Sequence, residues 1–294
     1  LTAEQAQAAA PAPPRPSPRV AAAPPVAERT TMVTPPAPAA VPNPLVAEDT
    51  RTVTPTVLDP VLVAALTPET VAAEQYRALR MRIAHTENGR QYRALIVTSP
   101  TSGDGKTTTA LNLALTMAQE FHKRVLIVDA DLRRGRLHEL LGLPASPGLS
   151  EVLTGEATLE EALVSLAEYH LAVLPAGSPT ARPAEMLGST EMRRVVDILR
   201  TQYDRILFDT PPVVALADVG VLAPLVDGVL MVVRAGETTR PAIDRALREV
   251  HPAPVLGLVL NDVEDSVPDY PYFSGGSEAA PAGRARRAAR RHRS

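Results

Sequence analysis

The stretch ALIVTSPTSGDGKTT, residues 94–108, decides the fold of this chain. Its first four residues form an apolar run typical of a buried strand, and the glycines that follow let backbone N–H groups close around an anion. Lys106 can reach the β- and γ-phosphates of a nucleotide, and the Thr107 hydroxyl can join a Mg²⁺ shell. We therefore predict a phosphate-binding loop made of Thr101, Ser102, Gly103, Asp104, Gly105, Lys106, Thr107 and Thr108.

The residues after the loop supply the helix that such a motif needs. Leu111, Ala114, Leu115 and Ala118 recur at helical spacing. One helix face can therefore pack on a sheet while its N-terminus points at the anion. Pro100 stands where the general pattern has its first glycine. Glycine–lysine–threonine triplets also occur on ordinary surface turns, but the flanking strand and helix favour a nucleotide site.

Further apolar runs predict the rest of a sheet. Their nearly continuous hydrophobicity indicates strands that are covered on both faces, and helix-like segments lie between them. The predicted class is α/β, with a doubly wound and mostly parallel sheet. The predicted strands are 94–97, 125–128, 171–174, 206–208, 229–233 and 255–260, and the predicted helices include 67–86, 191–201 and 240–250.

Composition separates both ends of the chain from this pattern. Nearly half of the 30 prolines precede Leu66, which predicts a disordered Pro- and Ala-rich linker over residues 1–66 and a folded domain over 67–266. Residues 267–294 are predicted to be a flexible tail, rich in arginine from residue 283 onward. That basic end can be a solvated end or can contact anionic lipid. The lack of aromatic residues among the arginines makes nucleic acid the weakest reading.

The cellular compartment is constrained by what the chain lacks. The absence of cysteine excludes disulfides and thiolate metal sites and fits a reducing compartment. No window of ~18 apolar residues predicts a membrane-spanning helix. Because the chain opens on Leu1 rather than Met, we expect either an alternative start codon or the cytosolic part of a longer polypeptide.

Two further predicted strands end in carboxylates. Asp129 and Asp131 follow the run over 125–128, and Asp209 follows the run over 206–208. Because the carboxyl ends of parallel strands share one edge, these groups are expected to converge on a γ-phosphate and its metal. One hydroxyl and one or two carboxylates suffice for Mg²⁺, and a further carboxylate can accept a proton. Aspartate also ends strands as a turn former, yet three beside a phosphate loop favour a metal–nucleotide site.

Over roughly residues 68–262 the chain resembles the bacterial tyrosine autokinases of capsule and exopolysaccharide synthesis. These belong to the deviant Walker group of P-loop NTPases, which also holds the MinD- and ParA-like ATPases. The stretches that carry the resemblance are DADLR at 129–133, similar to a second Walker A element, ILFDTPP at 206–212, similar to a Walker B element, GLSEVL at 148–153, LPAG at 174–177, PAEML at 183–187, and Glu74-x-x-Arg77-x-x-Arg80, similar to an oligomerisation motif.

The resemblance implies ATP and Mg²⁺ as cofactors and gives the site residues roles. Lys106 and the backbone of 103–108 would hold the phosphates, and Thr107, Asp131 and Asp209 would hold Mg²⁺. Asp129 would be the carboxylate on the acceptor side. The resemblance leaves open which of the two roles, metal ligand or acceptor-side carboxylate, belongs to Asp129 and which to Asp131. Two further residues each have two possible roles. Arg133 can stabilise charge at the phosphate site or be a surface cation, and Asn261 can contact adenine or be a turn residue at the end of a strand.

The implied function is an ATP-dependent protein-tyrosine autokinase that phosphorylates C-terminal tyrosines of a neighbouring subunit and regulates polysaccharide polymerisation and export. Tyr270 and Tyr272 are the candidate acceptors, fewer than such clusters usually hold, and they can instead anchor the last loop.

The implied partners are a transmembrane activator (polysaccharide co-polymerase), separate or fused upstream, a cognate tyrosine phosphatase, and further copies in a closed ring at the inner face of the plasma membrane. The ring would use Glu74, Arg77 and Arg80, which are otherwise ordinary exposed helix charges.

Two other functions are compatible with the sequence. A MinD- or ParA-like positioning ATPase would typically carry lysine at the place of Thr101, although the arginine-rich end gives that reading some support. A nucleotide-regulated scaffold with little kinase activity is suggested by the scarce tyrosines. No nucleic-acid partner is expected.

Overall fold

The computed structural model of the chain describes residues 51–263, apart from 56, 88, 90, 121, 215 and 216. Tyr270, Tyr272, the arginine-rich end and most of the predicted N-terminal linker lie outside the described residues. No helix among the described residues is long and apolar enough to cross a membrane.

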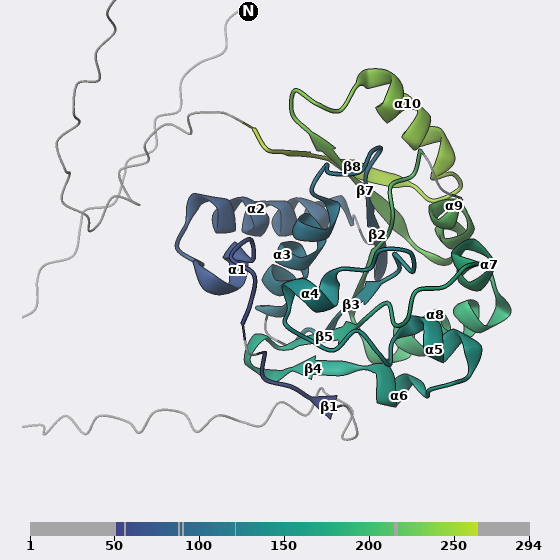
Figure 1. The fold of residues 1–294 in the computed structure, drawn as a ribbon. Helices are drawn as coiled ribbons and strands as arrows, with labels where there is room; N and C mark the ends of the chain where they lie inside the picture. The colour runs from purple at the N-terminus through teal and green to yellow at the C-terminus, as the bar shows by residue number, and fades with distance from the viewer. Residues whose placement is uncertain are drawn as a thin grey trace, which may run out of the picture. The chain divides into compact units, whose positions relative to one another are not determined.

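An eight-stranded sheet forms the centre of the folded part, and it confirms the predicted doubly wound α/β class (Figure 1). Every neighbouring pair is parallel except β4 and β5, which are antiparallel, so β1 and β4 run against the other strands. In spatial order the strands are β1 (Arg51–Thr52), β4 (Val164–Leu166), β5 (Leu171–Leu174), β3 (Val125–Asp129), β6 (Arg205–Asp209), β2 (Ala94–Thr98), β7 (Gly228–Arg234) and β8 (Val255–Asn261).

Helices cover both faces of the sheet, which explains why the strands are apolar on both sides. Along β2, Leu95 and Val97 pack into one hydrophobic core and Ile96 into the other. The first core is covered by α1 (Val63–Leu66), α2 (Val71–Thr86), α3 (Lys106–Ala118) and α4 (Leu137–Leu140). The second lies under α5 (Leu149–Thr154), α6 (Leu159–Ala162), α7 (Pro183–Leu187), α8 (Thr190–Gln202), α9 (Asp218–Leu222) and α10 (Arg240–Glu249).

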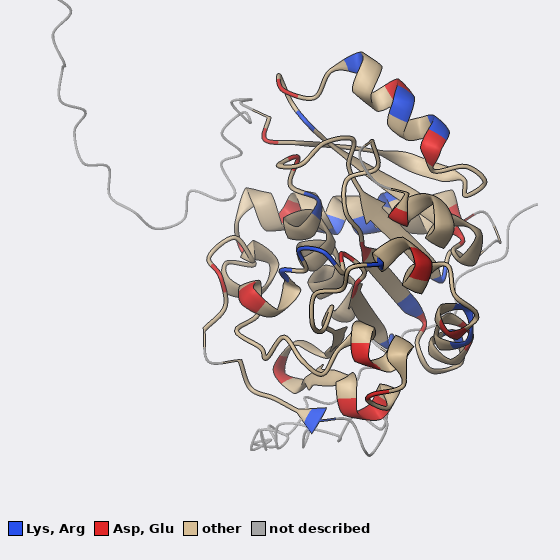
Figure 2. Cartoon of the chain, turned by 45° about the vertical axis from the view of Figure 1, so that its right-hand side comes forward, with Lys and Arg blue, Asp and Glu red and all other residues tan. Residues whose placement is uncertain are grey.

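The helices differ in how deeply they are buried. Every residue from Thr109 to Ala118 of α3 is buried, so this helix is locked between the sheet and the first two helices. In α10 Ala246 is buried, and acidic and basic residues follow one another along the helix (Figure 2). The phosphate-binding motif therefore leads into a helix most of whose residues are buried.

The N-terminal boundary differs from the prediction. Within the segment 51–66, predicted as linker, Leu58 and Leu62 are buried. The Asn112 side chain accepts a hydrogen bond from Ala64 N and donates one to Val61 O, both 2.9 Å long. The folded part therefore begins before residue 67.

The start of the first long helix also differs. The sequence predicts that this helix begins at Thr67, but α2 starts at Val71, because the Thr70 hydroxyl caps it by accepting a hydrogen bond from Ala73 N at 3.3 Å. Pro68 lies in the turn before it.

Candidate active site

The phosphate-binding loop connects β2 to α3 at the carboxyl edge of the sheet. Gly103 and Gly105 have φ values of 91° and 90°, in the left-handed region that favours glycine. Gly105 is also the N-cap of α3, and a Cβ atom there would lie 2.1 Å from Nδ2 of Asn261. The loop thus needs glycine for its backbone conformation and for the close approach of a side chain.

Side chains from distant parts of the chain hold the loop in shape. The buried Asp104 carboxylate accepts hydrogen bonds from Thr101 N at 2.9 Å and from the hydroxyl of Thr238 at 2.9 Å. The Asn261 side chain donates to Asp104 O at 3.0 Å. Asp104 and Thr101 thus shape the loop, and Asn261, predicted as a contact for adenine, is placed against the loop backbone.

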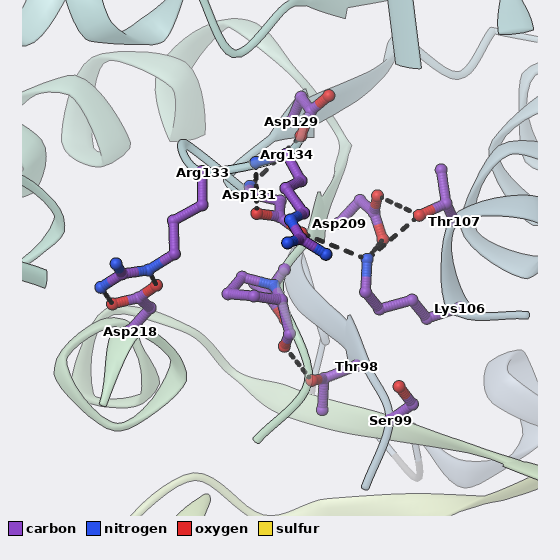
Figure 3. A network of polar contacts seen from close by, with 12 residues as sticks. Thr98, Ser99, Lys106, Thr107, Asp129, Asp131, Arg133, Arg134, Asp209 and Asp218 are labelled. Carbon is purple, nitrogen blue, oxygen red and sulfur yellow. Dashed lines mark hydrogen bonds and ion pairs between the residues drawn. The ribbon is translucent and has the colours of Figure 1, made fainter. Parts of the chain in front are cut away.

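The predicted phosphate and metal residues do converge (Figure 3). Lys106 Nζ lies 3.6 Å from Asp131 Oδ2, 3.7 Å from Asp209 Oδ1 and 3.1 Å from the Thr107 hydroxyl. That hydroxyl donates to Asp209 Oδ2 at 2.8 Å. Three strand or loop ends thus bring one cation, one hydroxyl and two carboxylates together.

Asp129 lies beside this cluster but is held differently. It is fully buried, and its two oxygens accept backbone hydrogen bonds from Asp131 N at 3.2 Å and Leu137 N at 3.0 Å. Burial raises the pKa of Asp129, and the nearby negative charge of Asp209 raises it further. Burial also raises the pKa of Asp209, against the opposing effects of Lys106 and Thr107. Burial thus disfavours the negative charge of both carboxyl groups. A bound cation would stabilise that charge, so the pair is suited to holding one.

The donor set fits Mg²⁺. Asp209 Oδ1 is buried and receives no hydrogen bond from the described residues, and Thr107 and Asp131 place further oxygen ligands nearby. Among the described residues no group of three or more His, Cys, Asp or Glu side chains is arranged to hold a metal ion alone. Mg²⁺ needs fewer protein ligands, because it keeps waters and binds substrate phosphates.

Arg133 is not part of the cluster. Its guanidinium donates to the Asp218 carboxylate at 3.0 and 3.3 Å and points away from Lys106 (Figure 3). Asp218, at the start of α9, is buried, so the pair ties the acidic loop after β3 to the segment after β6. Sequence reasoning missed Asp218 and Thr238, since neither belongs to a motif that signals its contact.

The structure separates the three residues of the predicted oligomerisation motif. Glu74 and Arg77 form an exposed ion pair at 2.6 Å, and Arg77 also donates to Pro68 O. Arg80 instead turns toward α3 of its own chain, where it donates to Thr116 O at 2.8 Å.

Comparisons with known proteins agree with this geometry. A family model described as an AAA domain matches residues 93–250. Tyrosine-protein kinase YwqD of Bacillus subtilis (strain 168) is 35% identical over 202 residues, which cover 68% of this chain and 85% of YwqD. The chain belongs to the bacterial tyrosine-protein kinases. The predicted resemblance and the predicted enzyme class are thereby confirmed.

A longer relative and a solved structure give two further comparisons. It is 31% identical to tyrosine-protein kinase wzc of Salmonella typhi over 217 residues, but it spans only 30% of the length of that relative. The kinase domain of the Escherichia coli tyrosine kinase ETK matches with a TM-score of 0.67 and 29% identity, covering 76% of this chain and 84% of the ETK domain. The kinase thus has the P-loop fold of this family.

Proposed function

We propose that this kinase is a Mg²⁺-dependent autokinase that transfers the γ-phosphoryl group of ATP to Tyr270 or Tyr272 of a neighbouring subunit. One observation carries the proposal. Lys106 lies within 3.7 Å of the Asp131 and Asp209 carboxylates and beside the Thr107 hydroxyl, at the N-terminus of a long helix.

The loop and α3 suit the binding of the nucleotide's phosphates. The backbone N–H groups of 103–108 would surround the phosphate oxygens, and the positive end of the helix dipole favours their negative charge. Lys106 would leave the two carboxylates to contact the phosphates. Thr107, Asp131 and Asp209 would hold Mg²⁺, which supplies positive charge against the charge of the transferring phosphoryl group.

Asp129 is the best candidate to receive the proton of the acceptor. As the tyrosine oxygen bonds to the γ-phosphorus, the bond to ADP breaks and the phenolic proton needs an acceptor. The raised pKa makes the ionised form of Asp129 a stronger base than an ordinary carboxylate, and the positive charge of bound Mg²⁺ would favour that ionised form. Asp131, not Asp129, forms the ion pair with Lys106, which supports Asp131 as the metal ligand.

The biological setting follows from the family resemblance. The kinase would regulate polymerisation and export of a capsular or exopolysaccharide, at the inner face of the plasma membrane, through a transmembrane activator. Its copies would form a ring through Glu74, Arg77 and Arg80, of which the Glu74–Arg77 pair is exposed, and a cognate phosphatase would reverse the modification.

Mapping phosphotyrosine after incubation with ATP and Mg²⁺ tests the proposal. Phosphate on Tyr270 or Tyr272 should disappear in Lys106→Met. It should persist in the matched control Lys123→Met, because Lys123 precedes β3 and so lies at the opposite edge of the sheet. ATP turnover without phosphotyrosine would indicate a positioning ATPase instead, and ATP binding without either would indicate a scaffold.

A further inference from the structure

The stretches GLSEVL and LPAG have no part in the nucleotide site, yet they meet around one carboxylate. Glu151 Oε2 accepts hydrogen bonds from Gly148 N at 2.8 Å and the Ser150 hydroxyl at 3.0 Å. Its Oε1 accepts from the Ser146 hydroxyl at 3.1 Å and Ser178 N at 2.9 Å. Four donors therefore hold a side chain that is only 9% exposed.

These contacts keep the carboxylate charged. Burial by itself would raise the pKa of Glu151, but the hydrogen bonds from Ser178 and Gly148 outweigh burial and lower it to about 2. A carboxylate that accepts four hydrogen bonds fixes the groups that donate them.

Gly177 lets the carboxylate come this close. It has a φ of 83°, and a Cβ atom there would lie 2.1 Å from Oε2 of Glu151. Beside it, Leu149 N donates to Pro175 O at 2.8 Å. The start of α5 and the loop after β5 are thus held together by backbone and side chain at once.

The loop after β5 in turn supports the acidic loop of the active site. A Cβ atom on Gly135 would lie 2.4 Å from Cβ of Ala176 and 2.7 Å from Oδ2 of Asp129, so Gly135 is enclosed between the two. Further along, Thr180 N donates to Leu132 O at 3.4 Å. The residues 175–180 therefore back the segment 129–135 at two points.

We infer that Glu151 is a positioning residue for phosphoryl transfer. It holds 175–180 in place, and these residues fix the loop that carries Asp129 and Asp131. The inference rests on the proposed roles of those two carboxylates. Because misplacing reacting groups by about 1 Å can cost about 100-fold in rate, loss of this support should slow transfer. Binding of ATP without Mg²⁺ should change little, since it needs residues 101–108, which lie on a different connection, between β2 and α3.

Two variants of the full chain disturb the contact between Glu151 and Gly177, one from each partner. Glu151→Gln keeps the shape but turns an NH₂ group toward N–H and O–H donors, and Gly177→Ala pushes a methyl group into the carboxylate. Each should lower kcat about 10- to 100-fold while the Kd for ATP measured without Mg²⁺ stays within about 2-fold. Glu161→Gln is the matched control, because Glu161 accepts a similar capping hydrogen bond from Thr158 N at 2.8 Å on α6. It should change neither constant.

Amide hydrogen exchange separates this inference from the kinase proposal, because it needs no activity. Exchange over residues 129–137 should quicken in both variants and not in Glu161→Gln, while exchange over 101–108 stays the same. Unchanged exchange over 129–137 in folded variants, or a loss that falls equally on ATP binding, overturns the positioning role. If the unaltered chain phosphorylates no tyrosine, the proposed function fails and exchange alone decides the inference.

Discussion

Gly105 is the most tightly constrained residue of the nucleotide site. Its φ of 90° belongs to the left-handed region, and Asn261 packs where a side chain would stand. Both constraints act on the N–H groups that would face the phosphates. The end of β8 thus contacts and shapes a loop that lies more than 150 residues earlier in the chain.

A pair of substitutions separates the two constraints. Gly105→Ala should abolish measurable ATP binding in calorimetry, because it adds a collision with Asn261 to a backbone penalty of about 1–2 kcal/mol. The double variant Gly105→Ala/Asn261→Ala removes the collision together with the hydrogen bond from Asn261 to Asp104 O, so binding should return at least about tenfold weaker than in the unaltered chain. Binding by Gly105→Ala at the unaltered affinity would show that the loop does not bind phosphates in this conformation.

At the scale of elements, the contact between α2 and α3 links the predicted oligomerisation motif to the helix that begins with Lys106. Arg80 makes that contact through Thr116 O and lies 3.7 Å from Glu120. Arg77 stays on the exposed side with Glu74. The two arginines of one motif therefore have different tasks.

Their substitutions should differ in stability. Arg80→Ala removes a charged donor from a largely buried carbonyl and should cost about 1–3 kcal/mol in urea unfolding of the monomer. Arg77→Ala breaks an exposed ion pair and should cost less than about 1 kcal/mol. Equal effects would mean that Arg80 does not hold α2 to α3.

The hydrogen bonds around Glu151 also predict how stability depends on pH. The folded pKa of about 2 lies below the ordinary value of 4.5, so the carboxylate stabilises the fold above pH 4.5 and loses this effect as pH falls toward 2. At pH 7 the contribution is about 3 kcal/mol. The free energies of unfolding of the unaltered chain and of Glu151→Gln should therefore differ most near neutral pH and converge as the pH falls to about 2. A difference that stays constant with pH would contradict this.

Across the whole molecule, the segment 51–66 belongs to the folded part. Leu58 and Leu62 enter the core under α3, and Asn112 of α3 binds the backbone on both sides of Leu62, at Val61 O and Ala64 N. The helix that begins at the phosphate site is therefore braced by residues that precede the predicted domain.

Truncation of the chain measures how much the segment 51–66 contributes to stability. A chain that begins at residue 67 should be less stable than one that begins at residue 51 by roughly 3 kcal/mol or more, because two buried leucines are lost. Thermal unfolding of both chains checks it. Equal stability would mean that 51–66 contributes nothing to the core.

The match between sequence and structure depends on how far apart the contacting residues lie in the chain. Lys106, Thr107, Asp131 and Asp209 were predictable, because parallel strands bring their carboxyl ends to one edge. The contact of Arg80 with Thr116 O was not predictable. Residues three apart are displaced around a helix, so Arg80, six residues after Glu74, faces another direction. Proline content hid the buried Leu58 and Leu62. The contacts of Asp218 and Thr238 form only after distant loops meet, so no local pattern signals them.

The most direct test of phosphoryl transfer between subunits mixes two defective chains. One carries Lys106→Met and can only accept phosphate, and the other carries Tyr270→Phe and Tyr272→Phe and can only donate it. With ATP and Mg²⁺, mass spectrometry should find phosphotyrosine at 270 or 272 of the Lys106→Met chain, and only when both chains are present. Absence of phosphate from that chain, while the unaltered kinase phosphorylates itself, would contradict transfer from one subunit to its neighbour.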